Sequence, residues 1–247
     1  MQTVANGVLT NYEVVNPKAK KTALLLHGWA HNASLWLPLA KLLSKEYCYY
    51  LLDLPGFGGT KNLSLNSDVP EYTLFVKSFV DKLKLKNFIL IGHSFGGQIA
   101  GDFVLNFPKL IDRLFLIGAA VIRVRGPVAL SKIFIAKIFR PLIKFFPLDL
   151  ANQILKRYAP DSSLANEYQK SVLNRTLKYN LKMKLHLIKV PTEIVWGSED
   201  RVIPYVGTYL VENIHAARLH IVYEAGHNIH LTHTAELAAI LNQILTL

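Results

Sequence analysis

The 247-residue sequence is poor in cysteine and in long uninterrupted apolar runs. Its single cysteine, Cys48, excludes an internal disulfide framework, and its apolar surroundings predict a buried, inert thiol rather than a nucleophile. The longest stretch without a charged residue, 22–40, is broken by His, Asn, Ser, Gly and Pro, which argues against a membrane span. The opening segment 1–7 has neither the basic nor the apolar region of a secretory signal. We therefore expect a soluble protein of the cytoplasm.

Acidic residues are also scarce, but only in one part of the chain. The sequence has 28 Lys and Arg against 17 Asp and Glu, a net charge of +11. Residues 119–190 contain 14 of the basic and three of the acidic residues, so this segment holds the whole excess. A composition shift of this kind indicates an inserted unit. We therefore predict a core formed by residues 1–118 and 191–247, with residues 119–190 inserted into it.

Short apolar runs rich in branched residues alternate with amphipathic stretches along the predicted core, and no internal repeat is visible. Strands are expected at 22–26, 47–52, 87–91, 110–117, 192–196 and 219–223, after a hairpin at 4–15 that turns at Asn6-Gly7. Helices are expected at 34–43 (with Ser34 as N-cap), 69–83, 95–106, 204–214 and 232–245. This alternation predicts an α/β fold with a mostly parallel sheet flanked by helices. In such sheets the functional loops follow the carboxyl ends of the strands.

The sequence Gly92-His93-Ser94-Phe95-Gly96 lies where a buried strand meets a buried helix. A serine in this place needs a very sharp turn, and glycines beside it avoid collisions with the neighbouring backbone. The turn would hold the hydroxyl of Ser94 above the strand end, within reach of a base. A glycine-rich turn with a solvated serine is the alternative interpretation of this short pattern.

A serine hydroxyl is a poor nucleophile near neutral pH, so it needs a general base and a carboxylate that orients that base. Asp200 and His227 follow the last two predicted strands and complete the order Ser, Asp, His. We prefer Asp200 to the adjacent Glu199 because its shorter side chain is held more rigidly. We prefer His227 to the other late histidines because it directly follows a strand, in a loop beside a glycine. Those other candidates are His215, His220, His230 and His233.

Acyl transfer places negative charge on the carbonyl oxygen, which two backbone N–H groups must bind. Phe95, the residue after the serine, supplies one of them at a helix N-terminus. Trp29, in the loop after the strand at 22–26, is expected to supply the other. We expect His27, Gly28, Trp29 and Phe95 to line the substrate pocket. Core packing is the alternative role for the two aromatic rings.

Five motifs, in order, resemble the α/β-hydrolase superfamily, of the serine-carboxylesterase type with a helical cap. They are 26–29 (Leu-His-Gly-Trp), 53–58 (Asp-Leu-Pro-Gly-Phe-Gly), 92–97 (Gly-His-Ser-Phe-Gly-Gly), 196–200 (Trp-Gly-Ser-Glu-Asp) and 225–227 (Ala-Gly-His). The resemblance covers about residues 20–120 and 190–247 and includes small bacterial carboxylesterases such as the pimeloyl methyl ester esterase type. It also includes meta-cleavage C–C hydrolases, lactonases and cofactor-free haloperoxidases. Haloalkane dehalogenases and epoxide hydrolases differ, because they carry aspartate where this chain has Ser94.

The resemblance implies a hydrolase of carboxylic esters with short to medium acyl chains, acting through an acyl-enzyme. Ser94 is then the nucleophile, His227 the general base and Asp200 the acid that orients it, with no cofactor and no metal. C–C bond hydrolysis and lactone hydrolysis use the same machinery and remain alternatives. A non-catalytic binding protein on the same fold is the remaining class, although a binding role does not need all three residues.

The basic insertion occupies the position of the family's cap. Its residues Lys132, Lys137, Arg140 and Lys144 fall on one arc of a predicted helix, with apolar residues opposite. Solvated lysines on a helical cap are the first interpretation. Attraction of an anionic substrate and weak docking on an anionic membrane are the others. Nucleic acid is not an expected partner, because no recognition motif accompanies the charge. The sequence does not determine the oligomeric state.

Overall fold

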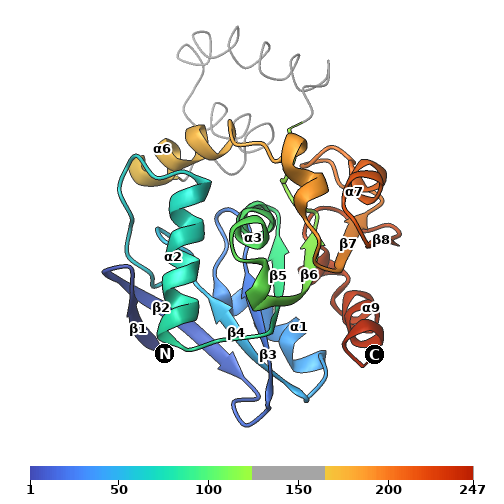
Figure 1. The fold of residues 1–247 in the computed structure, drawn as a ribbon, viewed down its shortest axis with the longest axis horizontal. Helices are drawn as coiled ribbons and strands as arrows, with labels where there is room; N and C mark the ends of the chain where they lie inside the picture. The colour runs from blue at the N-terminus through green and yellow to red at the C-terminus, as the bar shows by residue number, and fades with distance from the viewer. Residues whose placement is uncertain (124–164, 247) are drawn as a thin grey trace, which may run out of the picture.

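The computed structural model describes residues 1–123 and 165–246 (Figure 1). Their centre is an eight-stranded sheet in the order β1-β2-β4-β3-β5-β6-β7-β8. β2 pairs antiparallel with β1 and with β4, and every other neighbouring pair in this sheet is parallel. The strands are β1 Gln2–Ala5, β2 Val8–Val15, β3 Lys21–Leu26, β4 Tyr47–Leu52, β5 Phe88–His93, β6 Ile111–Ile117, β7 Thr192–Gly197 and β8 Ala217–Val222.

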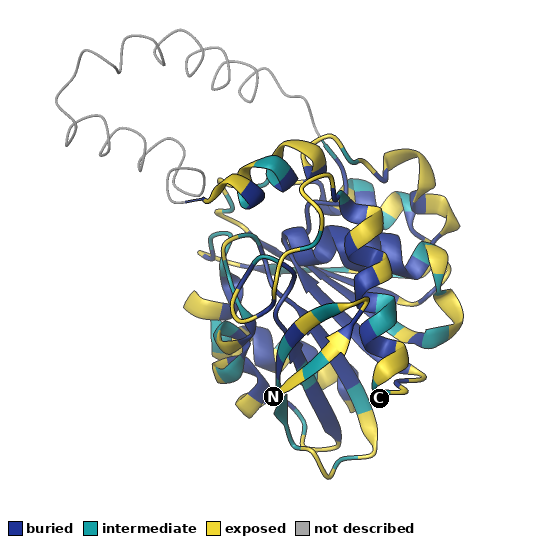
Figure 2. Ribbon diagram, turned by 90° about the vertical axis from the view of Figure 1, so that its left-hand side faces the viewer, coloured by how far each residue is buried: buried dark blue, intermediate teal, exposed yellow. Residues whose placement is uncertain are grey.

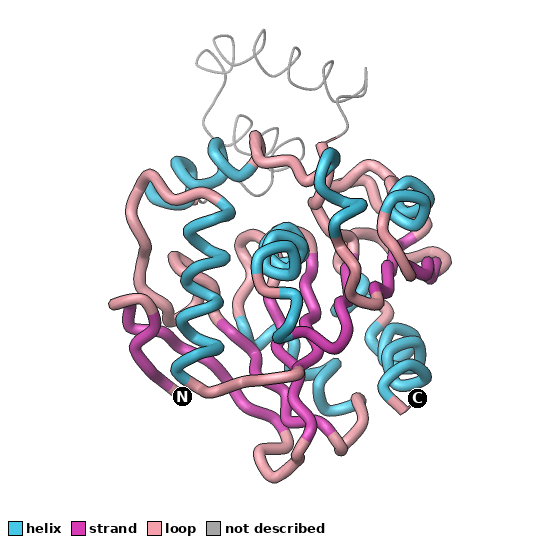
Figure 3. The backbone as a smooth tube through the Cα atoms, viewed as in Figure 1, coloured by secondary structure: helices cyan, strands magenta, loops and turns pink. Residues whose placement is uncertain are grey.

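Helices lie on both sides of the sheet, as the chain trace shows (Figure 3). The α-helices of the described residues are α1 Leu37–Leu42, α2 Val69–Lys82, α3 Phe95–Asn106, α6 Glu167–Thr176, α7 Gly207–Asn213, α8 Ile229–Thr232 and α9 Thr234–Leu245. Their 3-10 turns are η1 Ala33–Trp36, η2 Pro108–Leu110 and η3 Lys182–Leu187. Within these residues no helix combines the length and the apolar character needed to cross a bilayer.

Successive side chains of β3 point to opposite faces of the sheet and so build two separate cores. Leu24 and Leu26 pack into the core beneath α2, α3 and α7. Ala23 and Leu25 pack into the other core, beneath α1, α8 and α9. Because both faces are covered, the central strands consist almost entirely of buried residues (Figure 2). The α/β-hydrolase architecture expected from the sequence, with its mostly parallel sheet between helices, is confirmed.

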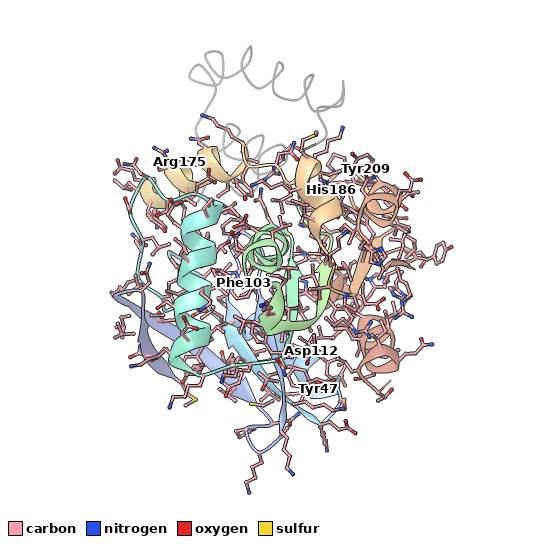
Figure 4. All side chains as sticks on the ribbon, viewed as in Figure 1. Tyr47, Phe103, Asp112, Arg175, His186 and Tyr209 are labelled. Carbon is pink, nitrogen blue, oxygen red and sulfur yellow. The ribbon has the colours of Figure 1, made fainter. Side chains whose placement is uncertain are left out.

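The strand order reverses at β3, which lies between β4 and β5. The chain passes from β3 to β4 on one side and then crosses to β5 on the other. Loops that leave the carboxyl ends of β3 and β5 therefore diverge, and the space between them is where open α/β sheets bind their ligands. Tyr47 and Asp112, at the starts of β4 and β6, mark the opposite, amino end of the sheet (Figure 4).

Three helices start later than predicted. Ser34 is not an N-cap: Asn32 takes the extended cap conformation (φ −150°), and its side chain accepts a hydrogen bond from the Ser34 N–H. This cap starts the 3-10 turn η1, and α1 begins only at Leu37. The helix expected from residue 204 begins at Gly207, and the closing helix starts at Thr234 after the separate short helix α8.

Both described ends of the segment 119–190 pack on the core. Ala119 and Val121 lie in the core beneath α3, together with Tyr168 of α6 and Leu181. The Leu181 N–H donates a hydrogen bond to the Val121 carbonyl oxygen (2.9 Å), so the two ends meet at one point. The predicted helix with Lys132, Lys137, Arg140 and Lys144 lies outside the described residues. The division into a core and an inserted cap stays a prediction.

Candidate active site

Ser94 occupies a strained turn between β5 and α3. Its backbone angles are φ 52° and ψ −112°, a region that side chains with a Cβ rarely adopt. The Ser94 N–H donates to the Ile117 carbonyl at the end of β6 (3.0 Å), and the Ser94 carbonyl accepts from the Ala120 N–H (3.1 Å). The turn is thus fixed from the neighbouring strand, which keeps the serine in this conformation.

Glycines on both sides of Ser94 allow the close approach that this turn requires. A Cβ on Gly92 would lie 2.5 Å from the Gly96 carbonyl oxygen. A Cβ on Gly96 would lie 2.3 Å from the Leu26 carbonyl oxygen at the end of β3. Since both obstacles are backbone atoms, which cannot rotate away, larger residues at either position would force α3 off the sheet.

Asp200 and His227 form a buried pair at the carboxyl edge of the sheet. Nδ1 of His227 donates to Oδ2 of Asp200 over 2.8 Å, and the two side chains are 10% and 1% exposed. Oδ1 of Asp200 accepts the N–H groups of Val202 (2.9 Å) and Ile203 (3.0 Å). The carboxylate is therefore held at both oxygens, and it holds the imidazole with its proton on Nδ1. The lone pair of Nε2 then remains available to accept a proton.

Two contacts bring this pair to the serine turn. His93, the residue before Ser94, donates from Nε2 to the His227 carbonyl oxygen (3.0 Å). Gly118, directly after β6, lies under the pair, because a Cβ there would stand 3.3 Å from His227 Nδ1 and 3.4 Å from Asp200 Oδ2. Three strand ends, those of β5, β6 and β7, and the loop after β8 therefore meet at one place.

Four of the other candidates, Glu199 and three histidines, lie elsewhere, whereas His230 is buried with its ring 4.4 Å from that of His93. Glu199 is exposed, and His215 is exposed at the surface. His220 pairs with the buried carboxylate of Glu193 on β7 (2.9 Å). His233 interacts with the neighbouring Thr232 hydroxyl. Among hydrogen bonds within residues 1–123 and 165–246, Asp200 pairs with His227 and with none of these alternatives.

The peptide N–H groups of Trp29 and Phe95 have no hydrogen-bond acceptor among the described residues. Gly28, which has no Cβ, lets the backbone before Trp29 pass close to the serine. A Cβ at Gly28 would lie 3.3 Å from Ser94 Cβ and 2.7 Å from His93 Nδ1. Phe95 opens α3, so its N–H lies at the positive end of the helix dipole. Two uncommitted donors beside a serine suit the binding of an oxyanion.

Aromatic rings form a wall beside these donors. The Trp29 ring packs edge-on against Phe57 (centroids 4.9 Å apart) and against Phe95 (5.4 Å). Tyr72 of α2 contacts Phe95 from the other side (5.1 Å). Phe95 is buried and Trp29 half-buried, so both rings pack in the core, and Trp29 also keeps some open surface. The sequence analysis does not predict Phe57 as a residue of the substrate pocket. The Gly- and Pro-rich loop after β4 that carries it is nevertheless one of the five family motifs.

His27 is buried in the protein, whereas the sequence analysis expects it to line the substrate pocket. Its side chain is completely buried, so it offers no surface to a substrate. Nδ1 donates to the Gly28 carbonyl (2.8 Å) and Nε2 accepts from the Leu54 N–H (2.9 Å), which ties the loop after β3 to the loop after β4. Burial lowers the pKa of His27 to about 4, consistent with a neutral ring that uses both nitrogens for the backbone.

Asp53, which the sequence places in the motif 53–58 without a role of its own, is a second structural residue. Its buried carboxylate accepts the N–H groups of Ala33 (2.6 Å) and Gly59 (2.7 Å) and the side-chain amide of Asn11 (2.8 Å). Gly58, at φ +53°, passes so close that a Cβ would overlap this carboxylate. The carboxylate thereby shapes the loop that carries Phe57.

Comparison with known proteins agrees with this geometry. The profile of the Alpha/beta hydrolase family matches residues 23–240. The chain belongs to the α/β-hydrolase family. The hydrolase is 27% identical to human monoacylglycerol lipase ABHD6 over 86% of this chain and 72% of that protein. It is also 27% identical to an Escherichia coli 2-hydroxy-6-oxononadienedioate/2-hydroxy-6-oxononatrienedioate hydrolase, over 84% and 81% of the two chains.

Among solved structures, a membrane phospholipase A described as a bacterial virulence factor superimposes on the hydrolase with a TM-score of 0.81. The match covers 100% of this chain and 85% of that one at 22% identity, and it supports the fold. These similarities identify a hydrolase; the bond that it cleaves is a separate question.

Proposed function

We propose that this hydrolase cleaves carboxylic esters with short to medium acyl chains through an acyl-enzyme on Ser94. The observation that carries the proposal is the buried 2.8 Å pair of His227 Nδ1 and Asp200 Oδ2, next to a serine on a strained strand-to-helix turn. This arrangement supplies the base and its orienting acid in the order used by serine hydrolases of this fold.

In the proposed reaction, Ser94 Oγ attacks the ester carbonyl carbon while His227 Nε2 accepts the hydroxyl proton. Asp200 stabilises the imidazolium that forms. The negative charge on the carbonyl oxygen is bound by the N–H groups of Trp29 and Phe95. His227 returns its proton to the leaving alcohol as the C–O bond breaks. Water, deprotonated by His227, then attacks the acyl-enzyme and releases the carboxylic acid, which restores the Ser94 hydroxyl.

Turnover of a p-nitrophenyl ester series from acetate to laurate, measured with the wild type and Ser94→Ala, tests this proposal. We expect the highest kcat/KM at short or medium chain length and a loss on the order of 10⁶ in kcat for Ser94→Ala. A fluorophosphonate probe should label the wild type at Ser94 and leave Ser94→Ala unlabelled. Most of the activity remaining in Ser94→Ala would contradict the assignment. A binding protein without catalysis would give neither turnover nor labelling.

C–C bond hydrolysis is the second candidate, because the Escherichia coli relative is named as a 2-hydroxy-6-oxononadienedioate/2-hydroxy-6-oxononatrienedioate hydrolase. The same serine and histidine would act on a vinylogous diketone, whose colour disappears on cleavage. Comparing kcat/KM for such a compound, for a lactone and for the best p-nitrophenyl ester separates the three reactions. The ester proposal predicts the highest value for the ester.

We also propose that the protein works in the cytoplasm. Its only cysteine, Cys48, is a buried free thiol, which suits a reducing compartment. Fractionation of cells that make the native chain should recover it with cytoplasmic markers. Recovery in the membrane pellet, and its release by salt, would favour peripheral membrane binding instead.

A further inference from the structure

Three histidines gather behind the proposed triad without belonging to it. His31 lies in the loop after β3, His93 ends β5, and His230 belongs to α8. The His93 ring lies 5.7 Å from His31 and 4.4 Å from His230, and His31 lies 5.5 Å from His230. Each offers one ring nitrogen such that all three nitrogens lie within 4.8 Å of one another.

The proton of His93 is fixed by its surroundings. Its Nε2 lies 3.0 Å from the His227 carbonyl oxygen, which can only accept, so Nε2 carries the hydrogen. Nδ1 of the neutral ring then has a free lone pair. This Nδ1 is buried and has no hydrogen-bond partner among the described residues. A ligating histidine that donates its other N–H to a backbone carbonyl is the usual second-shell arrangement of metal sites.

His230 adds an independent observation. The residue has no exposed surface, and neither of its ring nitrogens has a hydrogen-bond partner in the described part of the chain. Buried polar atoms are normally paired, so two unpaired nitrogens on one ring require an explanation. Burial also lowers the pKa of His230 to about 3, which leaves the ring neutral and able to donate a lone pair.

We propose that His31, His93 and His230 form a binding site for a divalent transition-metal ion, with Zn²⁺ as the best-suited ion. Imidazole ligands suit Zn²⁺, Cu²⁺ or Ni²⁺ and do not suit Mg²⁺ or Ca²⁺. Zn–N bonds of about 2.0–2.1 Å in a tetrahedral site place the ligand nitrogens roughly 3.4 Å apart. The three nitrogens, which lie within 4.8 Å of one another, would therefore close by at most roughly 1.4 Å when the ion binds. His31 is only half-buried, so the ion would enter, and bind a fourth ligand, from its side.

The ion would act on the proposed active site through one hydrogen bond. A cation on Nδ1 of His93 makes its Nε2–H a stronger donor to the His227 carbonyl. The loop that carries His227 would then be held more firmly beside Ser94. The site therefore predicts metal-dependent stability, whatever ester or other bond the hydrolase cleaves.

The experiment uses the full chain, purified without a histidine tag and stripped of metal with a chelator. Zn²⁺ binding is measured by calorimetry, Co²⁺ binding by its visible absorption, and thermal unfolding with and without Zn²⁺. His230→Ala and the half-buried His31→Ala remove one ligand each, and circular dichroism verifies that each variant folds. His186→Ala and His215→Ala, at exposed histidines, are the matched controls.

We expect one ion per chain, a tetrahedral Co²⁺ spectrum and a midpoint raised by about 5–10 °C at Zn²⁺ about 100-fold above Kd. Affinity should fall at least about tenfold in His31→Ala and in His230→Ala, in line with the loss of a ligand, and stay unchanged in the two controls. No binding by the wild type, or equal binding by wild type and His31→Ala, overturns the proposal. Because binding is read without substrate, failure of the ester proposal would leave this result intact.

Discussion

The backbone of Ser94 stores strain that a different side chain would release. At φ 52° and ψ −112° the Cβ of serine is unfavourably placed, a cost of about 1–3 kcal/mol that the contacts with β6 sustain. Ser94→Gly and Ser94→Ala both remove the hydroxyl, but only glycine removes the Cβ. We expect Ser94→Gly to be more stable than Ser94→Ala by about 1 kcal/mol in urea unfolding. Equal or reversed midpoints would show that the turn is not strained.

Asp200 controls which nitrogen of His227 carries the proton. In Asp200→Asn the side-chain amide keeps the shape but can donate to Nδ1, which favours the tautomer that cannot accept a proton from Ser94. We predict a fall in kcat of about 10⁴ with the best ester. Glu199→Gln, one residue earlier and exposed, is the matched control and should keep its rate. A similar loss in both variants would point to the loop, not to the carboxylate.

His27 should make stability depend on pH. Its pKa is lowered from 6.5 to about 4 in the folded protein, first of all by burial. Between these values the unfolded chain takes up a proton that the folded chain refuses, so stability falls as pH decreases from 6.5 towards 4 and is unaffected above 6.5. The contribution of this residue is at most about 1.4 kcal/mol per pH unit.

Chemical unfolding of wild type and His27→Asn at pH 4.5, 5.5, 6.5 and 7.5 measures this contribution. The variant should be less stable at pH 7.5, because two backbone hydrogen bonds change, and should lose less stability on acidification. If both proteins lose stability with the same slope, His27 is not the titrating group.

At the scale of elements, α2 begins with a complete cap at its N-terminus. Asp68 and Glu71 form a capping box, in which each side chain accepts a backbone N–H at the other residue. Asp68→Ala removes the cap and should lower the free energy of unfolding by about 1 kcal/mol. Asp68→Asn keeps an oxygen in place and should cost much less. Urea denaturation of the three proteins distinguishes these outcomes.

Elements with a strong local pattern were predictable from the sequence. The apolar runs that became β3, β4 and β6 are buried on both faces, so their composition alone reveals them. The apolar pattern does not reveal the start of α7, because local side-chain hydrogen bonds set it. Asp200 accepts the N–H groups of Val202 and Ile203 and holds that segment as a turn, so the helix begins later.

The same limit applies to the site. The sequence predicts the three candidate triad residues because each directly follows a strand, and parallel strands end at the same edge of the sheet. These residues are Ser94, Asp200 and His227. The buried role of His27 depends on the Leu54 N–H, 27 residues away in the chain, and the histidine cluster depends on three separate elements. No local pattern carries such contacts.

At the scale of the whole molecule, the excess of positive charge leads to a further prediction. A hollow of about 480 Å³ is lined by Arg123 and Lys182 together with Tyr205 and Tyr209. Within the described residues neither cation has a carboxylate partner: Arg123 contacts Gln98 and the Thr176 carbonyl, and Lys182 lies over the Tyr209 ring. We propose that these residues, with the basic insertion, attract anionic substrates.

This proposal predicts a salt dependence. Between about 20 and 500 mM NaCl, kcat/KM for an ester ending in a carboxylate should fall several-fold, since screening shortens the reach of the charges. The value for a neutral ester of equal length should change little. Replacing Arg123 and Lys182 by glutamine should flatten the dependence for the anionic ester. An identical response of both esters would reject steering.

The hydrogen bond between Leu181 and Val121 determines how the segment between these two residues is attached to the sheet. The bond joins the chain just after β6 to the chain that leads into β7, and these two strands are neighbours in the sheet. The segment between Val121 and Leu181 therefore begins and ends at the same place. If the residues between them are the inserted unit that the sequence predicts, a change in its length would leave the register of β6 against β7 unaltered. On that prediction, the substrate preference of such a chain could change through this one segment while Ser94, Asp200 and His227 keep their positions at the ends of the strands.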